Sequence, residues 1–197
     1  NSKQLSMALS DLCDTIYNEC PRIGNEMINY NKLTSAAVRA RRELVEAMAT
    51  NAAEEGLGLK GNGPEVAIYK SLLLEEGLHV KSETTGCWRF SLEGKDKTLA
   101  FLWRKIDECI NREGNKEGVG VEQIIDVLRA PPFGLKKGPL PIYISLYLLA
   151  KSNEIAVFRE GAYLPYISAA EMALMVKRPD LFTLKQFVTT NIEREVF

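Results

Sequence analysis

The densest group of positively charged side chains lies in one short stretch of the chain and consists of Lys32, Arg39, Arg41 and Arg42. Lysine and arginine contact the phosphates of nucleic acids, provided that their side chains are exposed. Arg39 and Arg42 are each followed four residues later by a glutamate, and such pairs on a helix neutralise part of the charge. The stretch is therefore a candidate phosphate contact. The alternative is a solvated helix face held by intrahelical ion pairs.

A second group of basic residues, Lys136, Lys137 and Arg159, surrounds the segment PIYISLYLLA. The spacing predicts a helix here, and between Pro141 and Ala150 it has no charged side chain. A helix that is apolar all round is a buried helix, whereas a helix that reads DNA bases exposes Arg, Lys, Asn or Gln. We therefore expect a structural or protein-contact role for the helix itself. The three basic residues around it are candidate contacts to nucleic acid.

His79 and Cys87 are the side chains that could act as a general base or as a nucleophile. The chain has one histidine, on an expected strand, so Cys87 has no histidine near it in sequence that could form a thiolate. An ordinary strand residue and a packed thiol are the simpler interpretations, and we predict no catalytic residue. A small enzyme that uses Cys87 or His79 is kept as the third hypothesis for the function.

The glycine-rich stretch GLGLKGNG, residues 56–63, has the composition of a phosphate-binding loop without its pattern. It lacks the Gly-Lys-Ser/Thr ending, and no apolar strand precedes it. Glycine-rich loops without that context are linkers far more often than nucleotide sites. The sequence therefore predicts no bound cofactor.

The four cysteines are spread along the chain and form no CxxC pair: Cys13, Cys20, Cys87 and Cys109. With a single histidine, a Cys/His zinc site is poorly supported, although four thiolates could bind zinc if the fold gathered them. Reduced, mostly buried thiols in a cytoplasmic protein are the simpler interpretation. We accordingly predict no metal site.

Composition sets limits on the class of protein. The chain has 197 residues, 46% of them apolar and 26% charged, with a formal net charge of -1 and a pI near 6.0. This balance exerts no global attraction on nucleic acid or anionic membranes, so any such binding needs a local patch. No apolar run approaches the roughly 20 residues that span a bilayer, and no signal peptide is visible. The chain opens on Asn1 with an apolar pattern already under way, which predicts a piece of a longer protein.

The spacing of apolar residues predicts the helices and strands that position these side chains. Amphipathic helices are expected over residues 5–20, 36–49, 66–76, 97–111 and 121–128, and hairpins over 78–90 and 154–164. On the helix 36–49, Arg41 falls on the apolar face. Of all stretches in the chain, Arg112 to Gly120 has the composition most typical of a linker. Phe182 to Phe187 is expected to form a short closing turn. Two helix–helix–hairpin units, about 21–95 and 119–167, follow from this order.

The predicted fold is mainly α with small β-hairpins (α+β), built from tandem winged-helix-like units. Residues 1–111 would hold a helical unit with the first motif. Residues 112–197 would hold the second motif and the closing helices.

Two segments resemble a known family. LSDLCDTIYNECPRIGNEMINYNKLTSAAVRARRELVEAM and LRAPPFGLKKGPLPIYISLYLLAKSNEIAVFREGAYLP are similar to segments of the very large bacterial P-loop ATPases of phage-defence systems of the BREX type. The resemblance implies a region C-terminal to the nucleotide-binding core, in a cytoplasmic protein that acts on or near DNA. No residue of this chain matches a Walker A lysine or a Walker B acidic pair, so the family's nucleotide site is not carried over.

These observations define the hypotheses. The first is a non-catalytic winged-helix-like module of a large phage-defence ATPase, with other domains of the same protein and double-stranded DNA as partners and no membrane contact. The second is a self-contained DNA-binding transcriptional regulator. Both place the nucleic-acid contact at the basic residues named above.

Overall fold

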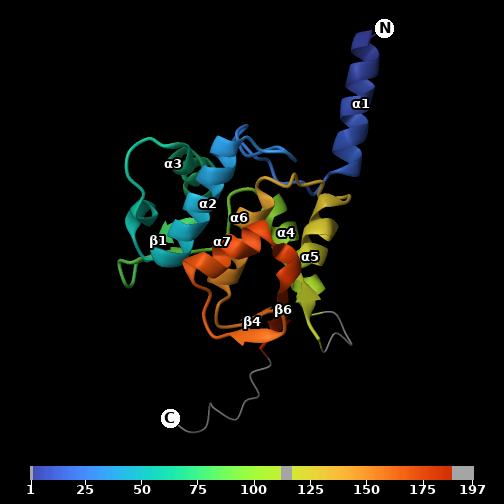
Figure 1. Cartoon of the computed structure of the whole chain (residues 1–197). Coiled ribbons are helices and arrows are strands. Elements are labelled where there is room, and N and C mark those ends of the chain that lie inside the picture. The colour runs from blue at the N-terminus through green and yellow to red at the C-terminus, as the bar shows by residue number, and fades with distance from the viewer. Residues whose placement is uncertain (1, 112–116, 188–197) are drawn as a thin grey trace.

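Helices supply most of the regular structure in the computed structural model, which describes residues 2–111 and 117–187 (Figure 1). The α-helices are α1 (Ser2–Ile16), α2 (Ser35–Thr50), α3 (Pro64–Tyr69), α4 (Thr98–Ile110), α5 (Val121–Arg129), α6 (Leu140–Ala150) and α7 (Ala169–Lys177). Shorter helical turns, η1 (Glu55–Gly58), η2 (Lys70–Leu74) and η3 (Pro179–Leu181), join them. The strands are β1 (His79–Lys81), β2 (Trp88–Phe90), β3 (Val119–Gly120), β4 (Ile155–Arg159), β5 (Ala162–Leu164) and β6 (Phe182–Gln186). The mixed α+β class predicted from the sequence is confirmed.

Helix α2 begins where the sequence predicts, because the Thr34 side chain accepts a hydrogen bond from the Ala37 N–H. Such a cap satisfies one of the backbone donors left free at a helix start. The buried face of α2 carries small and aliphatic side chains, including Ala40, Leu44 and Met48. This face packs against α3, α6 and α7, so α2 lies among elements from both ends of the chain.

Helix α6 is the centre of the hydrophobic core. Its residues from Leu140 to Leu148 are all buried, which confirms the prediction of a buried helix from its lack of charge. Tyr143 and Tyr147 contact Trp103 of α4, the first ring edge-on and the second nearly parallel, with ring centroids 5.8 and 6.3 Å apart. The Tyr147 hydroxyl also donates a hydrogen bond to Asp107 of α4. Aromatic contacts and this polar link therefore fix α4 against α6.

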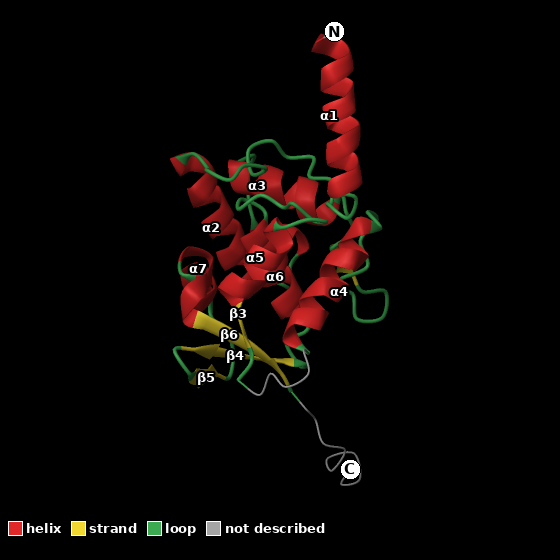
Figure 2. Ribbon diagram, turned by 90° about the vertical axis from the view of Figure 1, so that its right-hand side faces the viewer, coloured by secondary structure: helices red, strands yellow, loops and turns green. Residues whose placement is uncertain are grey.

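Two antiparallel sheets accompany the helices, and Figure 2 shows the larger one below them. The smaller sheet is the predicted hairpin β1–β2, in which Val80 pairs with Arg89. The larger sheet has the strand order β3-β6-β4-β5. Its β4–β5 hairpin was predicted, with Phe158 opposite Tyr163.

The prediction of a closing turn over residues 182–187 is wrong, because residues 182–186 form strand β6 in the middle of the sheet. Leu184 pairs with Val157 of β4 on one side and with Val119 of β3 on the other. Phe182 and Leu184 are buried, while the residues between and after them are partly exposed, which is the alternation of a strand with one covered face. Strand β3 also lies inside the predicted linker 112–120, of which residues 112–116 fall outside the described part of the chain.

One hydrophobic cluster contains buried residues from both predicted units. It joins Leu44 of α2 and Leu73 of η2 to Tyr147 of α6 and Met172 of α7. Helix α2 packs on α7, and β2 packs on α6, across the boundary predicted at 111/112. The described parts of the two predicted units therefore share one core.

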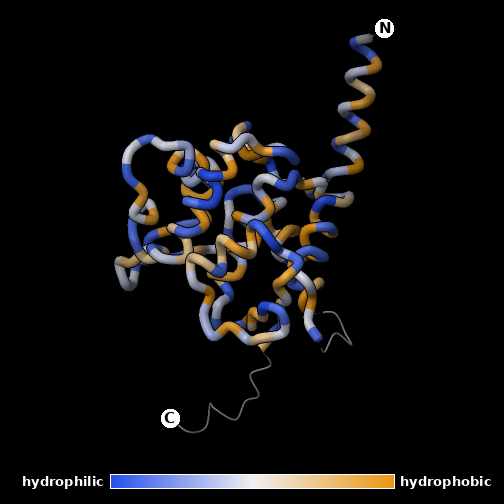
Figure 3. The backbone as a smooth tube through the Cα atoms, in the orientation of Figure 1, coloured by the Kyte–Doolittle hydropathy of each residue, from blue (hydrophilic) through white to orange (hydrophobic). Residues whose placement is uncertain are grey.

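Helix α1 confirms the amphipathic helix predicted at the start of the chain, but its setting differs from that of the other helices. It projects away from the body as a single rod (Figures 1 and 2). Figure 3 shows apolar residues recurring along this rod, outside the body. Among the described residues, no helix combines the length and hydropathy required to cross a membrane.

Candidate nucleic-acid interface

The fold brings together the two basic segments that lie about a hundred residues apart in the sequence. The Lys137 N–H donates to the side-chain oxygen of Asn31 at 3.1 Å, and the Gly138 N–H donates to the Tyr30 carbonyl at 2.9 Å. These bonds hold the loop before α6 against the segment before α2. Lys136 and Lys137 consequently lie beside the stretch that contains Lys32.

Arg41 reinforces the same junction. Its Nη1 donates to the carbonyl oxygens of Lys137 at 3.1 Å and Gly138 at 3.3 Å. The side chain is half-buried, in agreement with its position on the apolar face of α2. Burial lowers the pKa of the Arg41 guanidinium, although an arginine keeps its charge at any physiological pH. Arg41 therefore positions the loop, a role that its sequence context did not indicate.

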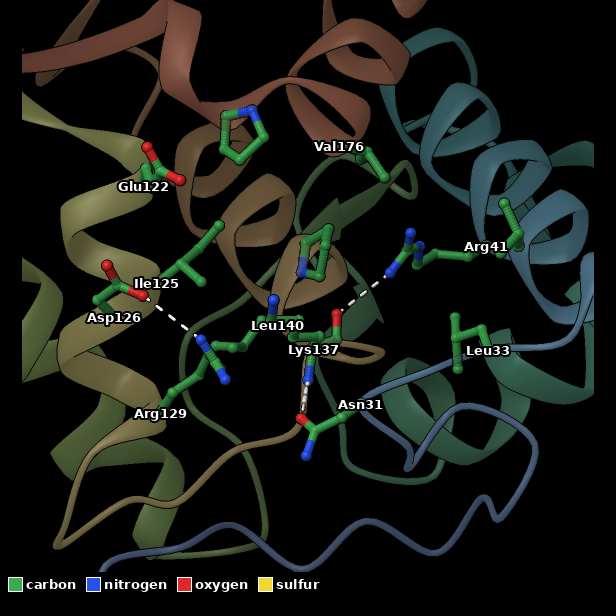
Figure 4. A pocket seen from close by; sticks show the side chains of 13 residues that line it. Asn31, Leu33, Arg41, Glu122, Ile125, Asp126, Arg129, Lys137, Leu140 and Val176 are labelled. Carbon is green, nitrogen blue, oxygen red and sulfur yellow. Dashed lines mark hydrogen bonds and ion pairs between the residues drawn. The ribbon is translucent and has the colours of Figure 1, made fainter.

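A cleft of about 270 Å³ opens next to this junction (Figure 4). Arg41 from α2 and Arg129 from α5 approach it from opposite sides, with Lys137 between them. Glu122 and Asp126 of α5 line the same wall as Arg129, and Asp126 lies 3.5 Å from the Arg129 guanidinium. The remaining lining is largely aliphatic. The cleft is thus lined by three cations, two carboxylates and a set of largely aliphatic side chains.

A second cleft of about 390 Å³ adjoins the first, since Asn31 and Arg129 line both. It adds Lys136, Asn29 and the ring of Tyr17. Arg129 is the basic residue that the sequence analysis missed. Its position at the end of a short helix, three residues after an aspartate, carries no signal of proximity to Lys136.

The exposed cations of the two joined segments are the groups best placed to meet phosphate. Lys32, Lys136 and Lys137 are exposed. Arg39 and Arg42 form the expected i,i+4 ion pairs with Glu43 and Glu46, each at 3.6 Å, yet their side chains are 68% and 58% exposed. Ion pairs this exposed contribute little and can be exchanged for phosphate contacts. Of these exposed cations, Lys137 lines the first cleft and Lys136 the second.

Arg159 is not part of this surface. It lies in β4, lines neither cleft, and its Nη1 forms an ion pair with Glu171 of α7 at 2.6 Å. Of the seven basic residues singled out in the sequence, the fold therefore sets this one apart from Lys136 and Lys137.

His79 is buried, and both of its ring nitrogens have partners. Nε2 is 2.9 Å from the Ala52 carbonyl, which can only accept, and Nδ1 is 2.9 Å from the Tyr69 hydroxyl. The ring also packs against Trp88 and Phe90. Burial lowers the pKa of His79, and the hydrogen bond to the Ala52 carbonyl opposes that shift. The neutral imidazole serves to fasten the β1–β2 hairpin to the turn after α2.

The expectation of mostly buried thiols is wrong. Cys13 and Cys87 are exposed, and Cys20 and Cys109 are partly buried. Burial raises the pKa of the Cys20 thiol. Within residues 2–111 and 117–187, no group of three His, Cys, Asp or Glu side chains is arranged to hold a metal ion.

The glycine-rich loop 56–63 is anchored in the core. Leu57 is fully buried although its φ is 57°, a left-handed conformation that aliphatic residues seldom adopt. The Asn51 side chain donates to the Leu57 carbonyl at 3.1 Å and so holds the loop against the end of α2.

Comparison with models of protein families, with curated proteins and with solved structures gave no match. The candidate interface consists of two basic segments that hydrogen bonds join, and Arg41, Lys136 and Lys137 of these segments line two adjacent clefts.

Proposed function

We propose that this chain is a non-catalytic, winged-helix-like module that contacts double-stranded DNA and other domains of a large phage-defence-type P-loop ATPase. The element order supports the winged-helix part of the proposal, because α5, α6 and the β4–β5 hairpin follow one another as helix, helix and wing. The buried second helix, α6, has no free face to place in a groove. The DNA contact therefore falls on the basic surface beside it.

The observation that best supports a DNA contact is that the two basic segments lie against each other. Hydrogen bonds from Lys137, Gly138 and Arg41 place the exposed Lys136 and Lys137 of one segment beside the segment that contains Lys32. Phosphate contacts need several exposed cations within reach of one backbone, and a chain with a net charge of -1 can supply them only as a local patch.

Fluorescence anisotropy with a labelled DNA duplex, repeated over a series of salt concentrations, tests the proposal. A triple Lys32→Ala, Lys136→Ala and Lys137→Ala variant is expected to bind more weakly. The slope of log K against log salt should become shallower by about 0.9 for each phosphate that the variant no longer neutralises. The triple Lys70→Ala, Lys81→Ala and Arg104→Ala variant is the control. It removes the same charge from exposed positions elsewhere on the protein.

Equal weakening in both triple variants would show that net charge, not this surface, governs binding. Absence of binding by the wild-type chain at low salt would overturn the DNA contact altogether.

A further inference from the structure

A half-buried cation in the first cleft has no counter-charge in the described part of the chain. Arg41 reaches from α2 into this cleft, and the two bonds from its Nη1 to the Lys137 and Gly138 carbonyls hold the guanidinium in place (Figure 4). Its Nε is buried and has no hydrogen-bond partner within residues 2–111 and 117–187. Burial lowers the pKa of Arg41, and no neighbouring carboxylate raises it. An unpaired charge away from water costs free energy, which an anion in the cleft would offset.

The two carboxylates of the cleft do not supply this counter-charge. Glu122 and Asp126 belong to α5, on the side of the cleft opposite Arg41 (Figure 4). Asp126 lies instead 3.5 Å from the Arg129 guanidinium. Lys137, the third cation of the lining, is exposed and forms no ion pair with any described residue. Arg41 and Lys137 therefore leave two positive charges in the cleft that an anion can pair with.

The rest of the lining indicates what the anionic group is attached to. Four aliphatic side chains that remain partly exposed line the cleft, each from a different segment: Leu33, Val38, Ile125 and Val176. None of the described residues that line it is aromatic. Nucleobases stack on aromatic rings, whereas aliphatic side chains cover apolar carbon chains. The volume of about 270 Å³ lies just below the range of about 300–1,000 Å³ that holds drug-sized ligands, so the ligand is small.

We propose that this cleft binds a small aliphatic carboxylic acid, whose carboxylate pairs with Arg41 and Lys137 and whose carbon chain covers the four aliphatic side chains. Both bonds of Arg41 use Nη1, so Nη2 remains available as a donor to the carboxylate. Three cations and two carboxylates give the lining a formal charge of +1, which a carboxylate matches. A phosphate monoester, with a charge of about −1.5 to −2, exceeds it. The proposal does not depend on the DNA contact, because the ligand is a separate small molecule.

Titration of the isotope-labelled chain with sodium 4-methylpentanoate at neutral pH, followed by amide NMR spectra, tests the site. The expected Kd is on the order of 1 mM, which suits a ligand of so few atoms. Binding should be about tenfold weaker, or worse, for 4-methylpentanamide, which lacks the charge, and for inorganic phosphate, which lacks the carbon chain. An unchanged spectrum at about 20 mM acid would overturn the proposal, as would an amide that binds equally well. Phosphate that binds as tightly as the acid would also overturn it and would assign the cleft to the phosphates of DNA.

A matched pair of variants at Val38 tests the role of Arg41 without removing the bonds that Arg41 makes. Val38 is 45% exposed and precedes Arg41 by three residues on α2, so the two side chains are neighbours on the helix. Val38→Asp places a carboxylate beside the guanidinium, whereas Val38→Asn has the same shape without the charge. The acid should bind to the Asp variant about tenfold more weakly than to the Asn variant. Equal Kd values for the two variants would contradict the pairing of the ligand with Arg41.

Discussion

His79 lies on a strand, as the sequence predicts, but its ring has partners that its neighbours in sequence do not indicate. Its spacing predicts an ordinary strand residue, whereas the ring links three segments: the turn at Ala52, the helix residue Tyr69 and the strand β1. The sequence could not indicate this, because the partners lie 10 and 27 residues away. A neutral imidazole that donates from one nitrogen and accepts at the other satisfies both partners without a buried charge.

The stability of the protein should fall as the pH is lowered through the titration of this histidine. The pKa of His79 is lowered in the folded state, so below about pH 6.5 the unfolded chain binds a proton that the folded chain excludes. The free energy of unfolding should decrease toward acid pH with a slope of at most about 1.4 kcal/mol per pH unit. Urea unfolding measured between pH 7.5 and 5.5 gives this slope.

His79→Gln provides the control for that measurement. The chain has no other histidine, so the variant should show little pH dependence in the same interval. A variant with the wild-type slope would assign the effect to carboxylates instead.

At the scale of elements, the contact between the loop before α6 and the segment before α2, which forms the candidate interface, depends on Gly138. A Cβ at Gly138 would lie 1.8 Å from the Ile28 carbonyl oxygen, so any larger residue must push the loop before α6 away from the segment before α2. Gly138→Ala is therefore expected to lower the free energy of unfolding by about 3 kcal/mol. Chemical denaturation measures the loss.

Gly24→Ala is the matched control, because a Cβ at Gly24 meets nothing within 4 Å. Its effect should be within about 0.5 kcal/mol of zero. Equal stabilities of the two variants would contradict the tight contact between these segments.

Most helices and strands could be predicted from the sequence, but few of the contacts between them could. Helices α2, α4, α5 and α6 and both hairpins follow from local periodicity, capping and turn residues. Strand β6 was missed because its alternation of Phe182 and Leu184 spans only five residues, and its partners lie in β3 and β4, far earlier in the chain. The basic residues of the interface were identified singly. Their proximity depends on bonds such as that between Asn31 and Lys137, which no local pattern encodes.

At the scale of the whole molecule, the shared core predicts that the chain cannot be divided at residue 111. Fragments 1–111 and 112–197, expressed separately, should each lack a cooperative unfolding transition, because α2 loses its cover from α6 and α7. Thermal unfolding followed by circular dichroism checks this against the intact chain. A cooperative transition in either fragment alone would show that the division into two independent domains is correct.

The position of β6 in the sheet has a consequence for biosynthesis. The strand order β3-β6-β4-β5 places the last described strand between strands that precede it in the sequence. During translation, β3 and the β4–β5 hairpin therefore leave the ribosome before the strand that connects them. Until Phe182–Gln186 emerges, β3 has no partner in the sheet and one edge of β4 is open. An open strand edge is a template for pairing with another chain, so the nascent protein passes through an aggregation-prone stage that ends only when β6 inserts.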